Sequence, residues 1–186
     1  MYAAMKNVYL SLGSNLGDRA ENITRAIEAL GERGVRVTKR SSLYETEPVN
    51  VRGGGWFLNA AVEAETELMP LQLLQVLLAV ERSLGRARRP EAKGTGQDPK
   101  EPRTIDIDIL LFGSSVVDSS GLAIPHPRMA ERRFVLAPLA EIAPEVQHPV
   151  LQQTIAELLA STPDRSQVRR FAENSGASAA GGTDQR

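Results

Sequence analysis

An alternating run in the second half of the chain constrains the fold more than any other part of the sequence. Between residues 104 and 112, Asp106 and Asp108 stand two positions apart, with isoleucines before, between and after them. Successive side chains of a strand point to opposite faces, so the aspartates share one face and the isoleucines the other. The run predicts a strand with one buried apolar face and two carboxylates whose Cα atoms lie about 6.5–7 Å apart.

The neighbouring elements are predicted from hydrophobic periodicity and from signals at their ends. Strands are expected over residues 8–12, 35–44 and 57–66, and helices over 18–31 and 70–85. This order predicts an α+β fold, a ferredoxin-like sandwich in which two main helices cover one face of an antiparallel sheet. A short helix over 134–142 and an amphipathic segment over 151–159 are expected as C-terminal additions.

Length and composition fit one folded domain. The chain has 186 residues, is 41% hydrophobic and contains no cysteine. This is enough apolar material for a core, and it excludes disulfide frameworks, thiolate metal sites and cysteine nucleophiles. We expect an N-terminal extension over residues 1–6, a folded domain over 7–165 and a disordered tail over 166–186, where apolar residues are few.

Charge and hydropathy limit the partners of the chain. Its net charge of −1 argues against a general nucleic-acid binder. No uninterrupted apolar run reaches 18 residues, and the N-terminus makes a poor signal peptide. We therefore expect a cytoplasmic monomer with no nucleic-acid partner and no membrane association.

A basic segment precedes the two aspartates. Residues 82–103 hold seven basic and three acidic side chains. From residue 86 to 102 the sequence shows no apolar periodicity, and so long a loop is usually functional. Taken alone, Asp106 and Asp108 are better explained as a solvated strand face, and the basic segment as a solvated or RNA-contacting loop. Together they indicate a polyphosphate site, because Mg²⁺ typically takes one or two carboxylates plus substrate phosphates.

Other candidate residues allow two interpretations each. His126 stands between two prolines, so it is either a rigid structural corner or a phosphate contact. Phe57 and Asn59 either bind a flat polar ligand or are an ordinary core phenylalanine and an edge asparagine. We interpret Glu81 as a buried structural group and His148 as a surface residue.

Six collinear runs give the chain a resemblance to a known family. They are LSLGSNLGDR, SSLYETEP, FLNAAVEAET, ERSLGRAR, PRTIDIDILLFG and IPHPRMAERRFVLAPLAEIAPE. Over about residues 7–160 the chain resembles the 6-hydroxymethyl-7,8-dihydropterin pyrophosphokinases. The resemblance implies a ferredoxin-like core and transfer of the β,γ-pyrophosphoryl group of ATP to the pterin hydroxymethyl oxygen, with release of AMP, in folate synthesis.

The resemblance also implies roles for particular residues. Asp106 and Asp108 would hold two Mg²⁺ ions, with ATP as co-substrate. The implied triphosphate contacts are Arg86, Arg88 and Arg103, and the further ATP contacts are Leu74, Ile109, His126 and Arg132. The implied pterin contacts are Gly13, Thr46, Phe57, Asn59 and Phe134. The alternatives are a non-catalytic ferredoxin-like module that binds nucleotide or RNA, and a kinase that transfers only the γ-phosphate.

Overall fold

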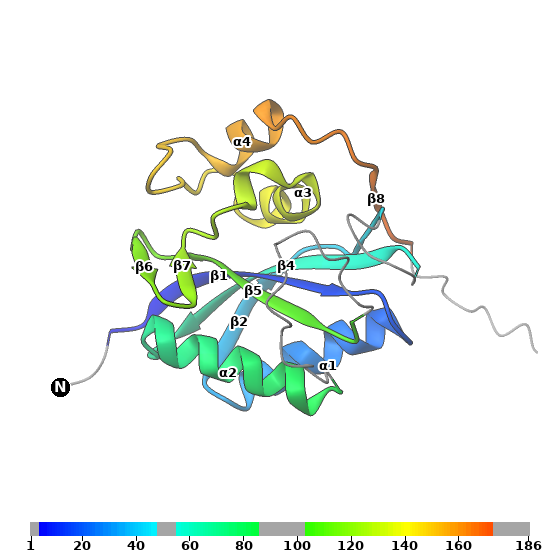
Figure 1. The fold of residues 1–186 in the computed structure, drawn as a ribbon, viewed down its shortest axis with the longest axis vertical. Coiled ribbons are helices and arrows are strands. Elements are labelled where there is room, and N and C mark those ends of the chain that lie inside the picture. Colours follow the sequence, from blue (N-terminus) through cyan, green and yellow to red (C-terminus); the bar gives the residue numbers. More distant parts are fainter. Residues whose placement is uncertain (1–3, 48–54, 86–102, 173–186) are drawn as a thin grey trace, which may run out of the picture.

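A six-stranded antiparallel sheet forms the centre of the protein (Figure 1). The computed structural model describes residues 4–47, 55–85 and 103–172, and all statements about the structure refer to these. The sheet contains β1 (Lys6–Ser14), β2 (Val35–Arg40), β3 (Tyr44–Thr46), β4 (Phe57–Thr66), β5 (Asp106–Phe112) and β8 (Val168–Arg170). Its order is β5-β1-β4-β3-β8, and β2 also pairs with β4.

Two layers of helices enclose the sheet (Figure 1). On one face lie α1 (Arg19–Gly31) and α2 (Pro70–Ser83), and on the other α3 (Arg133–Ile142) and α4 (Ile155–Ser161). A 3-10 turn (Met129–Glu131) precedes α3, and β6 (Val117–Ser119) and β7 (Leu122–Ile124) form a separate hairpin. The expected α+β, ferredoxin-like architecture is confirmed, with α1 and α2 as its two main helices and α3, α4 and β8 as the additions.

The sequence pattern accounts for the boundaries of the two main helices. The Asp18 side chain caps α1 by accepting the N–H of Glu21 at 3.0 Å. Gly34, with φ of 80°, takes the left-handed conformation just beyond that helix. Pro70 occupies the first turn of α2, where a missing N–H costs nothing.

Each face of the sheet has its own apolar core. On the α1 and α2 face, Val8, Leu10 and Leu12 of β1 pack with the isoleucines of β5. On the α3 face, Tyr9 packs with Leu136 and Leu139 of α3. The side chains of β1 thus alternate between the two cores, which places Ser11 and Gly13 on the same face as Tyr9.

Three expectations need correction. The strand expected over residues 35–44 is two strands, β2 and β3, separated by residues 41–43. Residues 168–170, expected within a disordered tail, form β8 and pair with β3. His148, expected at the surface, is 6% exposed and accepts backbone N–H groups at Nδ1. None of the helices in the described ranges combines the length and apolar character needed to cross a membrane.

Candidate active site

Asp106 and Asp108 lie on the face of the sheet that α3 covers. Asp106 is opposite Gly13 and Asp108 is opposite Ser11 on the neighbouring strand β1. Ile107 alternates with them and is buried in the core under α1 and α2. The two carboxylates therefore share one face, as the alternation in the sequence predicts.

Arg103 supplies positive charge to Asp106 and is held by the turn that follows β1. Its Nη1 donates to Asp106 Oδ2 at 2.5 Å. Its backbone N–H donates to Asn15 Oδ1 at 2.7 Å, and the N–H of Asn15 donates to the Arg103 carbonyl at 3.1 Å. Since Asn15 is only 5% exposed, these two bonds are shielded from water and fix the start of the aspartate strand.

Arg132, just before α3, is a second cation near the carboxylates. Burial lowers the pKa of Arg132 and nearby Arg128 lowers it further, whereas Asp108 and Asp106 raise it. The Arg132 guanidinium carbon lies 5.7 Å from the centroid of the Phe134 ring. An arginine remains charged at physiological pH despite such a shift. Arg132 therefore offers a fixed positive charge to an anion held beside the carboxylates.

His126 is oriented by two backbone contacts. Its N–H donates to the carbonyl of Leu110 on β5 at 2.9 Å, and its Nδ1 accepts the N–H of Arg128 at 3.1 Å. These contacts hold the imidazole next to the aspartate strand. A phosphate contact by His126 stays a prediction.

The expected pterin contacts of the sheet lie together where β1, β4 and β3 meet. Thr46 is opposite Phe57, and Asn59 is opposite Gly13. The Asn59 Nδ2 donates to Thr46 Oγ1 at 2.7 Å, and both side chains are almost fully buried. A Cβ added at Gly13 would lie only 2.8 Å from Asn59 Oδ1. This close approach explains why a glycine stands at this position.

Gly13 links the two halves of the site. It is opposite Asp106 on β5 and opposite Asn59 on β4. Adjacent strands lie about 4.8 Å apart, so the backbones of Asp106 and Asn59 are about 10 Å apart. Because glycine has no side chain, β1 places none between Asp106 and Asn59 on this face.

Some expected residues are not brought to this face. The side chains of Leu74 and Ile109 pack in the core on the α1 and α2 face, opposite the carboxylates. Arg86 and Arg88 lie outside the described residues. The roles expected for these four residues therefore stay predictions.

Asn15 and Glu81 contribute in ways that the sequence pattern does not reveal. Asn15 belongs to a glycine-rich turn, and nothing in its spacing indicates that it pairs with Arg103, 88 positions away. Glu81 on α2 is 2% exposed, and its Oε1 accepts the N–H of Ile107 at 2.9 Å. The structural role inferred for Glu81 is confirmed, because this bond ties α2 to the aspartate strand.

The donor set suits a hard divalent cation. Within the described ranges, no group of three or more His, Cys, Asp or Glu side chains is arranged to hold a metal ion. The available ligands are therefore the two carboxylates of Asp106 and Asp108. Mg²⁺ in phosphate-handling sites commonly uses one or two carboxylates and takes its other ligands from phosphates and water. The residues present fit that pattern.

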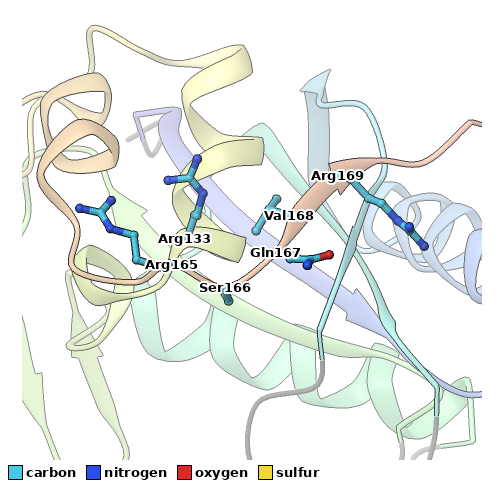
Figure 2. A pocket seen from close by; sticks show the side chains of 6 residues that line it. All are labelled: Arg133, Arg165, Ser166, Gln167, Val168 and Arg169. Carbon is cyan, nitrogen blue, oxygen red and sulfur yellow. The ribbon is translucent and has the colours of Figure 1, made fainter.

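An open hollow of about 480 Å³ lies between α3 and β8 (Figure 2). It is lined by Arg133, Arg165, Ser166, Gln167, Val168 and Arg169. None of these residues was expected at the site. Arg133 is adjacent in sequence to Arg132, but the hollow is lined by neither aspartate and by none of the expected pterin contacts.

Comparison with known proteins identifies relatives of the whole described domain. The family described as 7,8-dihydro-6-hydroxymethylpterin-pyrophosphokinase matches residues 9–144. A Bacillus subtilis protein named 2-amino-4-hydroxy-6-hydroxymethyldihydropteridine pyrophosphokinase is 42% identical over 174 residues, covering 92% of this chain and 95% of the relative. A Methylorubrum extorquens protein of the same name is 43% identical, covering 89% of this chain and 99% of the relative.

Solved structures agree on the fold. A crystal structure of wild-type Plasmodium falciparum HPPK-DHPS with pterin and p-hydroxybenzoate superposes with a TM-score of 0.65. The match is 19% identical and covers 86% of this chain but only 42% of that chain. At this identity the likeness supports the fold alone, and this chain spans less than half of the solved protein.

Proposed function

Since this chain belongs to the 7,8-dihydro-6-hydroxymethylpterin-pyrophosphokinase family, it is a pyrophosphokinase of folate synthesis, and we propose that it forms pterin diphosphate and AMP. In the proposed reaction, the hydroxymethyl oxygen of 6-hydroxymethyl-7,8-dihydropterin attacks the β-phosphorus of ATP. A new oxygen–phosphorus bond forms, and the bond from the β-phosphorus to the bridging oxygen of the α-phosphate breaks. AMP leaves with that oxygen, and the proton of the attacking hydroxyl is released to solvent.

The observation that carries this proposal is the position of Gly13. It pairs with Asp106 on one side and with Asn59 on the other. A phosphate chain near Asp106 and a flat ring near Asn59 would meet over this glycine. Pyrophosphoryl transfer needs this kind of alignment more than covalent catalysis by the protein.

The chain supplies charge on the phosphate side. Arg103 and Arg132 place two guanidinium groups near the carboxylates, where they would neutralise phosphate oxygens. Asp106 and Asp108 would hold Mg²⁺, and the proposal includes two such ions. Bound Mg²⁺ would stabilise the developing phosphate charge and lower the pKa of a coordinated hydroxyl.

The chain supplies shape and hydrogen bonding on the pterin side. Thr46 holds the Asn59 amide in one orientation, so Asn59 meets a ligand with preset polarity. Phe57 and Phe134 are only partly buried, so they would present aromatic surface to a flat ring. Binding through preset groups loses little conformational entropy on ligand binding.

Product analysis tests the proposal directly. The protein would be incubated with ATP, Mg²⁺ and 6-hydroxymethyl-7,8-dihydropterin, and the nucleotide product identified by chromatography. AMP with pterin diphosphate supports the proposal. ADP would indicate transfer of the γ-phosphate alone, and unchanged ATP would support a non-catalytic module that binds nucleotide or RNA; either result would refute it.

A second test removes one carboxylate. Asp108→Ala should lower turnover by about 10²–10³-fold, because charge stabilisation at the phosphates is lost while the partly exposed site tolerates the smaller side chain. Asp118→Ala, an exposed aspartate on β6, is the matched control and should keep full activity. Near-normal turnover of Asp108→Ala, with its thermal midpoint unchanged, would refute the role of the aspartate pair.

The proposal also makes this pyrophosphokinase a cytoplasmic monomer. Light scattering during size-exclusion chromatography should give a mass near the 20.2 kDa of one chain. A stable dimer mass would contradict this part.

A further inference from the structure

The C-terminal strand β8 covers the edge of the sheet that carries Thr46. It pairs antiparallel with β3, so that Thr46 is opposite Val168 and Glu45 is opposite Arg169. β3 has only three residues and would otherwise be an edge strand held from one side by β4. Pairing with β8 therefore supplies half of the lateral support of the strand that carries Thr46.

Arg169 contacts the residues that precede two expected pterin contacts, Thr46 and Phe57. Its Nη2 and Nε donate to Glu45 Oε2 at 2.6 and 3.1 Å. Its guanidinium carbon lies 4.6 Å from the centroid of the Trp56 ring. Figure 2 shows Arg169 extending from β8 away from Arg133 and Arg165. One side chain therefore holds the residue before Thr46 and the residue before Phe57.

Arg19 on α1 contacts the same two residues, Glu45 and Trp56. Its Nη2 donates to Glu45 Oε1 at 2.9 Å, and its Nη1 donates to the Trp56 carbonyl at 2.6 Å. We refer to Arg19, Glu45, Trp56 and Arg169 as the Arg169 cluster. The Glu45 side chain is 15% exposed, so its two ion pairs are better shielded than those of a fully solvated surface pair.

The arginines of the Arg169 cluster contact Glu45 on the face of β3 opposite to Thr46. Side chains alternate along β3, so Glu45 points to the α1 face while Thr46 points toward α3. Thr46 and Phe57 are directly opposite each other. Fixing Glu45 and Trp56 therefore fixes the spacing between these two pterin contacts without placing any cluster side chain among them.

We propose that Arg169 is a positioning residue for the pterin site, acting through Glu45 and Trp56. The inference rests on the proposed function, since it concerns the substrate proposed to bind at Thr46 and Phe57. The described contacts of Arg169 are with Glu45 and Trp56, beside the expected pterin contacts, whereas the described residues assigned to the phosphates lie on β5, at Arg103 and at Arg132 just before α3. Loss of Arg169 should therefore weaken pterin binding and leave ATP binding unchanged.

Arg169→Ala and Arg170→Ala make a matched pair for the test. Both arginines stand on β8 with side chains 64% exposed, and each pairs with one carboxylate, Glu45 or Glu141. Pterin affinity would be measured by calorimetry in the presence of a non-hydrolysable ATP analogue, together with the KM for each substrate and kcat. Arg169→Ala should raise the pterin Kd and KM about fivefold, the combined effect of one ion pair and one cation–π contact. Arg170→Ala should change them less than twofold.

Two further variants show whether Arg169 acts through the cluster. Arg169→Lys keeps a charge for Glu45 but loses the planar contact with Trp56, so its pterin Kd should lie between those of wild type and Arg169→Ala. In a Glu45→Gln background, Arg169→Ala should have a smaller effect than in the wild type, because the ion pair is already lost. Thermal midpoints identify any variant that does not fold. If Arg169→Ala does not fold, the pterin Kd of Arg169→Lys is compared with that of the wild type instead.

The outcomes separate this inference from the function on which it rests. If the wild type makes no pterin diphosphate, the proposed function fails. The positioning role is refuted if the wild type is active but Arg169→Ala binds pterin with normal affinity. It is also refuted if Arg169→Ala lowers the affinity for pterin and for ATP equally. Equal effects of Arg169→Ala and Arg170→Ala would also refute it, since they would show only that β8 had been loosened.

Discussion

Gly13→Ala should weaken pterin binding more than ATP binding, because its added Cβ would press on Asn59. The added Cβ would lie 2.8 Å from Asn59 Oδ1, so the amide must move by about 0.6 Å to restore an ordinary 3.4 Å contact. Asn59 is 3% exposed and donates to Thr46 Oγ1 at 2.7 Å, so it has no free space to enter. Overpacking of this kind costs about 1–3 kcal/mol. A distortion of that size at a ligand contact corresponds to about 5–150-fold in affinity.

The expected result is a pterin Kd raised by at least about fivefold, with the ATP Kd changed less than threefold. Calorimetry with each ligand measures both values, and denaturant unfolding measures the stability cost. Gly31→Ala is the control, because a Cβ at that helical position meets nothing within 4 Å and alanine favours the helix. An unchanged pterin Kd in Gly13→Ala would show that Asn59 does not contact the substrate, and equal losses for both ligands would show that the damage is not local.

Two further predictions concern His148 and Asn15. Burial lowers the pKa of His148 from 6.5, so the unfolded state binds more protons and the free energy of unfolding should fall as pH drops below about 6.5. His148→Gln should flatten this slope in denaturant titrations between about pH 5.5 and 7.5, and an identical slope would refute the assignment to His148. Asn15→Ala leaves the N–H of Arg103 without its acceptor and should lower kcat/KM for ATP about tenfold in initial-rate assays. The exposed Asn7→Ala is its control, and normal activity of Asn15→Ala would contradict a positioning role for Asn15.

The central part of the fold is predictable from sequence because local pattern and tertiary packing agree there. The alternation of Asp106 and Asp108 with isoleucines places the carboxylates on one face. The isoleucines pack in the core on the other face. The strand expected over residues 57–66 is β4 with the same bounds, and Pro70 begins α2 as expected. In these segments hydrophobic burial on one face is strong enough to fix the register.

The edge of the sheet is not predictable in the same way. Residues 168–170 form β8 through backbone pairing with β3 and through charged side chains, so no apolar period indicates them. β2 and β3 both pair with β4, but the register of pairing differs between them, and no local sequence signal marks this difference. His148 is buried by the backbone that turns around it, and composition alone does not reveal this. Long-range pairing decides all three features.

The antiparallel order of the sheet explains why the site residues converge. Gly13 lies near the end of β1 and Thr46 at the end of β3, whereas Phe57 and Asp106 begin β4 and β5. In an antiparallel sheet, the C-terminal end of one strand lies beside the N-terminal end of its neighbour, at the same end of the sheet. Four segments that are far apart in the sequence therefore deliver a glycine, a hydroxyl, an aromatic ring and a carboxylate to one place. The α1 and α2 face is filled with apolar side chains, so the α3 face at this end of the sheet is where polar groups can be grouped without breaking the core.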